Sequence, residues 1–386
     1  MSLQYKGVDI SDWLEYQVTN KYPHGKADNV DEFYYDAWYL RNELAAAPLT
    51  VSLSITDHCN MSCTHCSKKE FGEKIGYLSF YNYKIIIDKL VLAKVRRIVL
   101  TGGEPLLHDN ICEMIKYAKK GGLHISILTN LNCKRELLTK VLGFLDDNDT
   151  LQVSIDNVYE KYEEVRAGGC FELLESNCKV LIGSHPNIVA NMVVTDNNVA
   201  NMVDVLDFCE SMHFYSIRFT PVFSGSGCLN PPSDSQAFNY FTDVLKKYKM
   251  NNYKICIQSN PVPLLYPYFS VLREKYANFK YETSYYRCPA AVISFEVDIQ
   301  GDVYPCTYLI GKTTPFGNIY INPITEIWNS KRMNEFRCAT SNAEQCKKCD
   351  EFKKCMGGCK AESYKHYALF DKGDNTCFLR KGQNEI

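Results

Sequence analysis

The sequence has no long apolar run and almost no net charge. No apolar stretch reaches the ~18 residues that a membrane-spanning helix needs. The first residues, MSLQYKGVDISDW, lack the basic segment followed by an apolar one that marks a secretory signal peptide. The formal net charge is -2 at pH 7, which does not indicate a general nucleic-acid- or membrane-binding surface. We therefore expect a cytoplasmic protein without membrane or nucleic-acid partners.

Cysteine, in contrast, is abundant, with 18 residues in a chain of 386. In a small secreted chain this number would indicate disulfides, but in a large chain without a signal peptide it indicates metal binding. We expect a reducing, anaerobic setting. The hydrophobic content of 46% is enough for real cores, and the length suggests two or three domains.

From about residue 50 to 250, apolar strand-like runs alternate with helical segments. The predicted strands are residues 51–55, 97–100, 125–129, 151–155, 188–194 and 216–222. The predicted helices are residues 79–93 (capped by Ser79), 110–119, 134–145, 199–212 and 234–248. Such alternation predicts an α/β fold with a parallel sheet covered by helices. Six units are too few for a complete eight-stranded barrel.

Three cysteines, Cys59, Cys63 and Cys66, follow the first predicted strand directly. Their C-x3-C-x2-C spacing lets the sulfurs converge and leaves one ligand position empty. Structural zinc uses four protein ligands, whereas an iron-sulfur cluster held by three thiolates keeps one iron open. Taken alone, the triplet leaves a cluster, a zinc site and incidental cysteines as alternatives.

The run Thr101-Gly102-Gly103-Glu104-Pro105 after the second predicted strand favours the cluster. Together with the cysteine spacing, it resembles the radical S-adenosylmethionine (radical SAM) enzymes. The resemblance implies that the open iron chelates the amino and carboxylate groups of SAM, and that Gly102, Gly103, Glu104 and Pro105 receive the amino group. It also implies a 5′-deoxyadenosyl radical and an open, partial (β/α)6 TIM barrel that binds ligands at the carboxyl ends of its strands.

Residues after later strands resemble further motifs of this family. Thr129 and Asn130 are similar to its Thr-Asn turn beside SAM, Ser154 and Asp156 to its S-x-D pattern, and Arg166 lies in the family-like run VRAGGCF. The resemblance implies that Ser154 and Asp156 contact the SAM ribose or the substrate. It also implies that Arg166 reaches the SAM carboxylate or only closes a loop. Taken singly, such residues are ordinary caps and turns.

A second cysteine pattern lies near the end of the chain and comprises Cys288, Cys306, Cys346, Cys349, Cys355, Cys359 and Cys377. The pattern resembles the SPASM extension of radical SAM enzymes, a small cysteine-rich α+β domain with two auxiliary four-iron clusters. The resemblance implies that Cys288, Cys306 and Cys359 bind the first auxiliary cluster. It implies that the second is bound completely, by Cys346, Cys349, Cys355 and Cys377. A pair of zinc sites is the alternative, because C-x2-C pairs suit zinc equally well.

The first auxiliary cluster has only three ligands within the motif, because Glu282 stands where sulfatase maturases have a further cysteine. Either Cys256 or Cys338 supplies the fourth ligand, or the site is open and binds substrate, for example through a peptide thiolate. The cysteines outside the motifs are expected to be buried, small apolar residues. They are Cys112, Cys133, Cys170, Cys178, Cys209, Cys228, Cys256 and Cys338.

We expect four segments along the chain. Residues 1–48 form an N-terminal helical extension, with an amphipathic helix at residues 31–44. Residues 49–250 form the partial barrel and residues 251–284 a bridging region. Residues 285–386 form the SPASM domain, with a hairpin at residues 294–304 that turns at Gly301 and a helix at residues 324–336.

The resemblance implies an oxidoreductase that uses SAM and three 4Fe-4S clusters to oxidise a peptide or protein, as in ribosomal-peptide maturation. Expected partners are that substrate, a separate leader-binding partner and an electron donor such as flavodoxin or ferredoxin. Alternatives are a sulfatase maturase, a small-molecule oxidative decarboxylase, and a non-catalytic electron-transfer or zinc protein. Sulfatase maturation is disfavoured, because Thr307 stands where those enzymes carry an aspartate base. No catalytic acid or base is identified.

Overall fold

The computed structural model describes residues 44–66, 76–223, 229–259, 288–349 and 352–377. It also describes two short strands, β1 (Gln4–Tyr5) and β2 (Val8–Asp9), which pair antiparallel. The helix predicted at residues 31–44, most of the bridging region and Cys228 lie outside the described residues.

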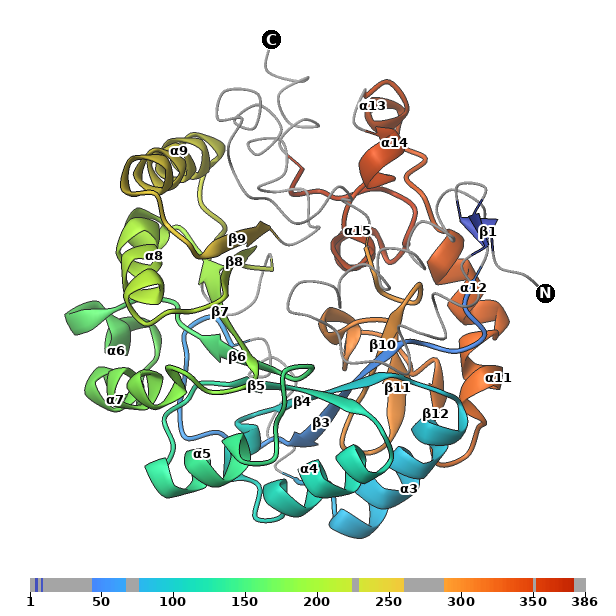
Figure 1. Ribbon diagram of the computed structural model, residues 1–386. Helices are drawn as coiled ribbons and strands as arrows, with labels where there is room; N and C mark the ends of the chain where they lie inside the picture. The colour runs from blue at the N-terminus through green and yellow to red at the C-terminus, as the bar shows by residue number, and fades with distance from the viewer. Residues whose placement is uncertain are drawn as a thin grey trace.

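One ten-stranded sheet runs through the described part of the chain, in the order β12-β11-β10-β3-β4-β5-β6-β7-β8-β9 (Figure 1). Its parallel strands along the barrel are β3 (Thr50–Thr56), β4 (Arg97–Gly102), β5 (His124–Thr129), β6 (Thr150–Ser154), β7 (Asn187–Val194), β8 (Ser216–Pro221) and β9 (Cys256–Ser259). The first six correspond to the six predicted strands. The parallel α/β sheet is therefore confirmed.

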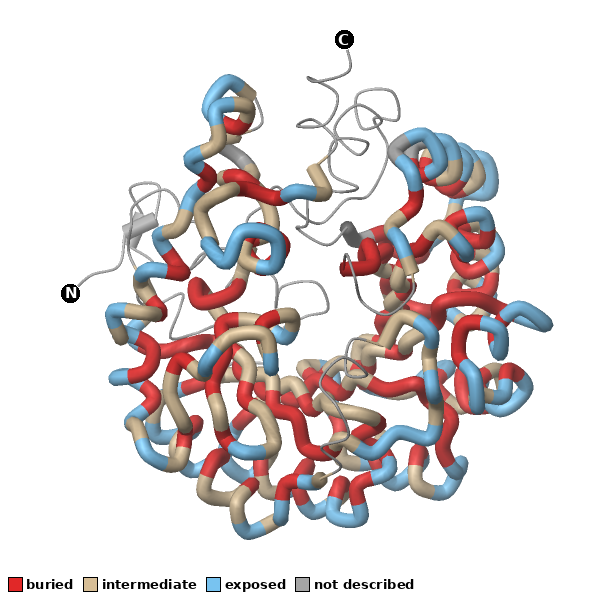
Figure 2. The backbone as a smooth tube through the Cα atoms, turned by 180° about the vertical axis from the view of Figure 1, so that it is seen from behind, coloured by how far each residue is buried: buried red, intermediate tan, exposed pale blue. Residues whose placement is uncertain are grey.

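Helices cover the outer face of this curved sheet, as Figure 1 shows. They are α3 (Phe80–Leu92), α4 (Ile111–Lys120), α5 (Arg135–Leu142), α6 (Tyr162–Val165), α7 (Phe171–Leu181), α8 (Met202–Ser211) and α9 (Asp234–Asn251). The predicted cap is confirmed, since the Ser79 hydroxyl accepts a hydrogen bond from Asn82 N (3.1 Å). Buried residues follow the strands, and exposed residues lie on the outer sides of the helices (Figure 2).

The sheet extends beyond the six strands predicted for the barrel. Strand β9 adds parallel to β8, with Cys256 opposite Ser216, within the segment expected to be a bridge. On the other edge, β10 (Ser294–Val297) pairs parallel with β3, with Ser294 opposite Thr50. The first strand of the cysteine-rich region therefore belongs to the barrel sheet.

The C-terminal region continues as an antiparallel meander from β10 through β11 (Asp302–Tyr304) to β12 (Gly317–Asn318). The predicted hairpin is confirmed, and Gly301 takes a positive φ of 83° in its turn. Its helices are α11 (Ile324–Trp328), α12 (Lys331–Cys338), α13 (Glu344–Lys347), α14 (Phe352–Cys355) and α15 (Lys360–Tyr367). The single helix predicted at 324–336 is wrong, because Ser330 caps a new helix and accepts a hydrogen bond from Met333 N.

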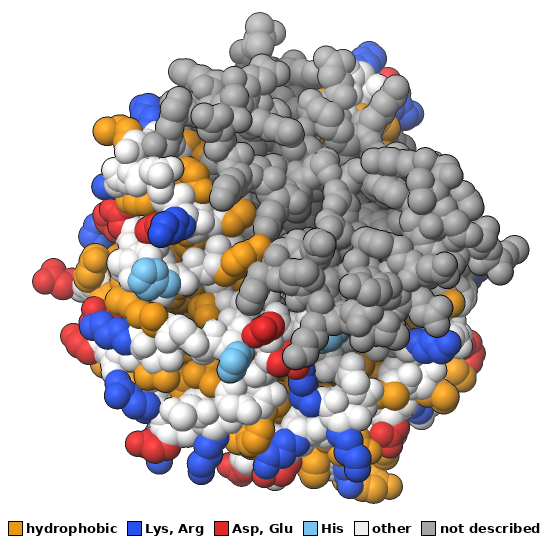
Figure 3. All heavy atoms as spheres, in the orientation of Figure 1, with side chains coloured by type: hydrophobic (Ala, Val, Ile, Leu, Met, Phe, Trp, Pro, Cys, Tyr) orange, Lys and Arg blue, Asp and Glu red, His pale blue; other side chains and the backbone are white. Residues whose placement is uncertain are grey.

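Positive and negative side chains are interspersed over the described part of the face in Figure 3. Within the described ranges, no helix is both long and apolar enough to cross a membrane. Among the cysteines outside the motifs, burial is confirmed for Cys133, Cys178, Cys209 and Cys256. The same expectation is wrong for Cys170 and Cys338, which are exposed, and Cys112 is only partly buried.

Candidate metal centre

The first cysteine loop begins where β3 ends, and the turn after β4 is hydrogen-bonded to its start. Gly103 N donates to Thr56 O and Glu104 N donates to His58 O, each at 2.7 Å. A Cβ on Gly102 would lie 2.1 Å from Thr56 O, and one on Gly103 would lie 2.0 Å from His58 O. Both positions therefore require glycine, because the two backbones touch there.

The Glu104 carboxylate joins the ends of β4 and β5 inside the protein. It is 1% exposed, and its Oε1 accepts hydrogen bonds from Thr129 Oγ1 (2.7 Å) and Leu106 N (3.0 Å), while Oε2 accepts one from Asn130 N (2.7 Å). Burial raises the pKa of this carboxyl, and the hydrogen bonds act against that shift. Pro105 begins the short 3-10 helix that follows, Pro105–Leu107.

A chain of asparagine amides holds the cysteine loop from the β5 side. Asn130 Nδ2 donates to Asn60 Oδ1 at 2.8 Å and lies 3.9 Å from Cys59 Sγ. Asn60 Nδ2 in turn donates to Asn132 O at 2.8 Å. The sequence analysis identified Asn130 but missed Asn60 and Asn132, although Asn60 lies between two motif cysteines.

The segment after α6 pairs with the cysteine loop through its backbone. Ser62 N donates to Ala167 O at 2.7 Å, and Thr64 N donates to Val165 O at 3.1 Å. Gly168 has a φ of +88°, and a Cβ there would lie 3.1 Å from Asn60 O. The run VRAGGCF therefore lines the cysteine loop.

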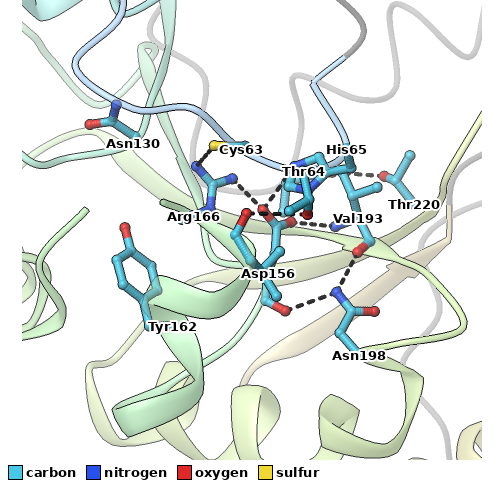
Figure 4. Close-up of polar contacts among 12 residues, drawn as sticks. Cys63, Thr64, His65, Asn130, Asp156, Tyr162, Arg166, Val193, Asn198 and Thr220 are labelled. Carbon is cyan, nitrogen blue, oxygen red and sulfur yellow. Dashed lines mark hydrogen bonds and ion pairs between the residues drawn. The ribbon is translucent and has the colours of Figure 1, made fainter. Parts of the chain in front are cut away.

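Asp156, just after β6, is completely buried at the centre of a polar group (Figure 4). Its Oδ2 lies 2.5 Å from Arg166 Nη2 and 3.1 Å from His65 Nε2, and its Oδ1 accepts a hydrogen bond from Val193 N (2.7 Å). Burial alone would raise the pKa of Asp156, but the ion pairs with Arg166 and His65 hold it well below its usual range. Arg166 Nη1 also lies 3.9 Å from Cys63 Sγ.

The structure thus gathers most of the predicted SAM-site residues around one loop. Asp156 contacts protein groups instead of presenting an open carboxylate, and Ser154 is partly exposed at the end of β6. His65, which the sequence analysis missed, shares the Asp156 carboxylate with Arg166. Its position directly before Cys66 was the available signal.

The loop suits an iron-sulfur cluster by its donors. Cys59 is exposed and Cys63 and Cys66 are partly exposed, and their thiols are free. Burial raises the pKa of the Cys63 thiol to about 11, and Arg166 opposes that shift. N–H donors lie beside two of the sulfurs, as in cluster sites where hydrogen bonds to sulfur are common. In the described ranges, no three His, Cys, Asp or Glu side chains are arranged to hold a single metal ion.

Cys288, Cys306 and Cys359, predicted as one ligand set, are electrostatic neighbours. Burial raises the pKa of the Cys359 thiol well above its usual value, and Asp374, Cys288 and Cys306 add to the shift. Burial likewise raises the pKa of Cys306, with Cys288 as the next cause. Cys288 and Cys359 are 71 positions apart in the sequence. The fold therefore brings together cysteines that lie far apart along the chain.

A buried lysine lies beside this group. Lys360 is 8% exposed, and its Nζ donates to Phe336 O at 2.8 Å and to Arg337 O at 2.7 Å. Burial lowers the pKa of Lys360 to about 8, while nearby Cys288 and Cys359 act in the opposite direction. The lysine places a positive charge next to thiols that would become thiolates on binding iron.

Of the other predicted set, Cys346 lies in α13 and Cys355 ends α14, while Cys349 and Cys377 lie in loops. Cys349 N donates to Cys346 O at 3.1 Å, and Gly357 N lies 3.5 Å from Cys355 Sγ. A Cβ on Gly357 would lie 2.2 Å from Ser341 Cβ, so this turn also requires glycine.

Asp374, which the sequence analysis missed, connects the two C-terminal ligand sets. It is completely buried, and its Oδ2 accepts a hydrogen bond from Cys359 N (3.0 Å), while its Oδ1 accepts bonds from Thr376 N (2.8 Å) and Oγ1 (2.6 Å). Cys377 N donates to Asp374 O at 3.4 Å. One aspartate therefore orders the backbone at a cysteine of each set.

A ring contact joins the C-terminal region to the carboxyl end of β8. Tyr308, two residues after Cys306, stacks on Phe223 with ring centroids 4.0 Å apart and planes 5° from parallel. The contact places the Cys306 loop at the end of the sheet where parallel α/β folds bind ligands.

Comparison with known proteins agrees with this geometry. Residues 53–209 match the radical SAM superfamily model, and residues 288–350 match the SPASM iron-sulfur cluster-binding domain. The AdoMet-dependent heme synthase of Methanosarcina barkeri is 23% identical over 355 residues, which cover 87% of this chain and 98% of that protein. The mycofactocin maturase MftC of Mycobacterium tuberculosis is 25% identical over 342 residues, covering 86% and 83%.

Among solved structures, that of Streptococcus suis SuiB bound to precursor peptide SuiA superposes with a TM-score of 0.71 at 17% identity. The match covers 93% of this chain and 82% of that one, and it shows that the folds are alike. The chain belongs to the radical SAM superfamily and carries a SPASM iron-sulfur domain.

Proposed function

We propose that this protein is a radical SAM maturase that oxidatively modifies a ribosomally made peptide. The observation that carries the proposal is the loop of Cys59, Cys63 and Cys66, held at the carboxyl end of the barrel by Arg166 and Asn130. The names of two similar proteins support a peptide substrate. MftC is a maturase, and SuiB was solved with a precursor peptide.

The residues of the loop divide into ligands and supports. Cys59, Cys63 and Cys66 would hold the SAM-binding 4Fe-4S cluster, and the backbone of Gly102 and Gly103 would lie beside it, since both glycines touch the loop. When bound, the cluster and SAM supply a 5′-deoxyadenosyl radical, which removes a hydrogen atom from an unactivated C–H bond. The protein's own groups position the loop, through the contacts of Arg166 and Asn130 with its sulfurs.

The C-terminal cysteines would hold two auxiliary 4Fe-4S clusters. Cys288, Cys306 and Cys359 would serve the first, and the second would use Cys346, Cys349, Cys355 and Cys377. For the open position of the first, Cys338 has better support than Cys256, because Cys338 also acts electrostatically on Lys360, the neighbour of Cys288 and Cys359. An external electron donor, such as flavodoxin or ferredoxin, and a leader-binding partner complete the proposal.

A second candidate is a radical SAM enzyme that acts on a small molecule. The observation that favours it is the similarity to an AdoMet-dependent heme synthase along 98% of that protein. The two candidates differ in the substrate that the barrel accepts and share the cysteine sites.

The test supplies both kinds of substrate to the anaerobically reconstituted, reduced protein with SAM. For the peptide arm, the probe is the product of a short reading frame next to this gene, analysed by mass spectrometry. We expect the peptide to lose two hydrogen atoms while 5′-deoxyadenosine forms: one would be transferred to the 5′-deoxyadenosyl radical, and the other would leave as a proton and an electron that an auxiliary cluster would accept. Modification of a heme precursor with an unchanged peptide would favour the second candidate, and no SAM-dependent 5′-deoxyadenosine at all would reject both.

A further inference from the structure

The Arg166 side chain joins a buried carboxylate to a cysteine of the first loop. Arg166 is 5% exposed, with Nη2 lying 2.5 Å from Asp156 Oδ2 and Nη1 lying 3.9 Å from Cys63 Sγ. Figure 4 shows the guanidinium between the two residues. A planar guanidinium with donors on both sides is suited to this double contact.

Backbone hydrogen bonds place Arg166 and Cys63 opposite each other. Cys63 lies between Ser62 and Thr64, whose N–H groups donate to the carbonyls of Ala167 and Val165, the two neighbours of Arg166. The two segments therefore run side by side like a short antiparallel pair. This pairing register places Arg166 directly opposite Cys63, so the contact between the guanidinium and the sulfur follows from the backbone hydrogen bonds.

Asp156 fixes the guanidinium from the opposite side. Its Oδ1 accepts a hydrogen bond from Val193 N of β7 (2.7 Å), and its backbone O accepts one from Asn198 Nδ2 (2.9 Å). If Arg166 turned away, Asp156 would lose its main counter-charge in a buried position, which is strongly destabilising. Arg166 is thus held toward Cys63 and is poorly placed to swing toward another anion.

We infer that Arg166 donates a hydrogen bond to Cys63 as a cluster ligand and so raises the reduction potential of the first cluster, with Asp156 as the positioning residue. A positive charge and an N–H donor next to a ligand sulfur stabilise the reduced cluster, which carries one more negative charge. Arg166 Nε is buried and has no hydrogen-bond partner among the described residues. The inference rests on the proposed assignment of the loop to a cluster and does not depend on the substrate.

The experiment measures the potential without SAM in the full, reconstituted protein and in the variants Arg166→Gln and Arg166→Lys. Redox titration is followed by electron paramagnetic resonance, and the spectrum of a variant with Cys59, Cys63 and Cys66 replaced by Ala is subtracted to isolate the first cluster. In Arg166→Gln we expect the ratio of reduced to oxidised cluster at a fixed potential to fall about tenfold, or about 59 mV for a one-electron couple. Arg166→Lys keeps the charge but loses the fork that contacts Asp156 and Cys63 together, so its potential should lie below that of wild type and above that of Arg166→Gln.

Lys119→Gln is the matched control. Lys119 Nζ also pairs with a completely buried aspartate, Asp149, at 2.8 Å, and with Asp146 at 2.7 Å. Asp149 accepts from Ile125 N, so this ion pair lies at the amino ends of the strands, away from the cysteine loop. The control loses an ion pair with another completely buried aspartate and should keep the wild-type potential.

Each outcome decides the inference. A wild-type potential in a cluster-loaded Arg166→Gln protein overturns it, and if SAM binding weakens in that protein, Arg166 serves SAM instead. If Arg166→Gln does not load the first cluster, Arg166→Lys decides the question by the same titration, and an unshifted potential there overturns the inference. If the wild-type protein forms no cluster at Cys59, Cys63 and Cys66, the proposed function fails first, and the two failures are therefore distinguishable.

Discussion

Two buried cations stand beside two groups of cysteines, and the protein holds them in different ways. Arg166 contacts Cys63 and is paired with the Asp156 carboxylate at 2.5 Å. Lys360, near Cys288 and Cys359, is instead held by backbone carbonyls at 2.7 and 2.8 Å. The first cation therefore has its counter-charge within the protein, whereas the second is compensated mainly by dipoles.

The pKa shifts of the two cations follow this difference. Burial opposes the charge of Arg166, but Asp156 outweighs it and raises the pKa of the guanidinium. Burial prevails at Lys360 and lowers its pKa to about 8. Loading a negatively charged cluster beside Lys360 would therefore supply the compensation that folding alone does not. The first cysteine loop is thus held by a charged pair within the barrel, whereas the C-terminal group lies beside a lysine whose hydrogen bonds, among the described residues, go to backbone carbonyls.

The largest expected effect comes from removing the first ligand set. Replacement of Cys59, Cys63 and Cys66 by Ala should abolish 5′-deoxyadenosine formation, because no iron would be left to bind SAM. The C-terminal region should keep its iron, since its ligands belong to a separate set of cysteines that this variant leaves unchanged. Iron and sulfide analysis with product chromatography checks both points. Undiminished 5′-deoxyadenosine formation in this variant would contradict the assignment of the SAM-binding cluster to these cysteines. It would also contradict the contrast between Arg166 and Lys360 as neighbours of two cluster sites.

A smaller effect is expected from Gly103→Ala. The new Cβ would lie 2.0 Å from His58 O and 2.8 Å from Asp57 O, so the start of the cysteine loop must shift. Strain of this kind commonly costs about 1–3 kcal/mol, and we expect at least a tenfold loss of 5′-deoxyadenosine rate with C-terminal iron retained. Gly143→Ala, which meets its nearest carbonyl at 3.4 Å, is the control. Equal rates in the two variants would show that the loop is not shaped by this turn.

Lys360→Met should act on the C-terminal region alone. It leaves the carbonyl of Arg337 without its lysine donor, at about 1–3 kcal/mol for a buried group left unsatisfied, while Phe336 O keeps the hydrogen bond from Ala339 N (3.3 Å). We expect lower stability and a partial loss of auxiliary iron, with 5′-deoxyadenosine formation retained. The matched control is Lys89→Met, since Lys89 also donates to two carbonyls of this region, Ile319 O and Tyr320 O. The same iron loss in both variants would remove any special role for Lys360.

Local sequence signals predicted the strands, the helices and one cap, because periodicity and capping act over a few neighbouring residues. Ser79 caps its helix as expected, and the glycine hairpin at Gly301 also forms. The break of the predicted helix before Lys331 was missed, although a serine directly before a helical run is a start signal. The cap at Ser330 was missed because apolar residues at helical spacing lie both before and after it.

Long-range pairing could not be read from the sequence. The edge contact of β10 with β3 joins residues more than 240 positions apart, such as Ser294 and Thr50, through runs of four residues. The shared use of Asp156 by His65 and Arg166 likewise depends on three loops meeting. Motif spacing found the cysteines, but the side chains that hold them were visible only in the fold.

Glu296 is a carboxylate on β10 that lies opposite Ser52 of β3, and its environment differs from that of Asp156. Burial raises the pKa of Glu296 to about 7, and hydrogen bonds from the Ser52 and Thr307 side chains act against the shift. Glu296 retains partial solvent exposure, so its effect on stability is smaller than full burial would give. This carboxyl is thus neutral over much of the range in which Asp156 is ionised.

The smallest expected effect follows from that protonation. Below about pH 4.5, Glu296 is protonated in both states. Between about 4.5 and 7 the unfolded chain releases the proton while the folded protein keeps it, so stability falls as the pH rises through this window. Glu296→Gln removes this titration. The free energy of unfolding of the variant, relative to that of wild type, should therefore rise by on the order of 1 kcal/mol between pH 5 and pH 8, and melting temperatures measured across this range check it. A difference that stays constant across this range would show that the β3–β10 seam does not carry a titrating carboxyl.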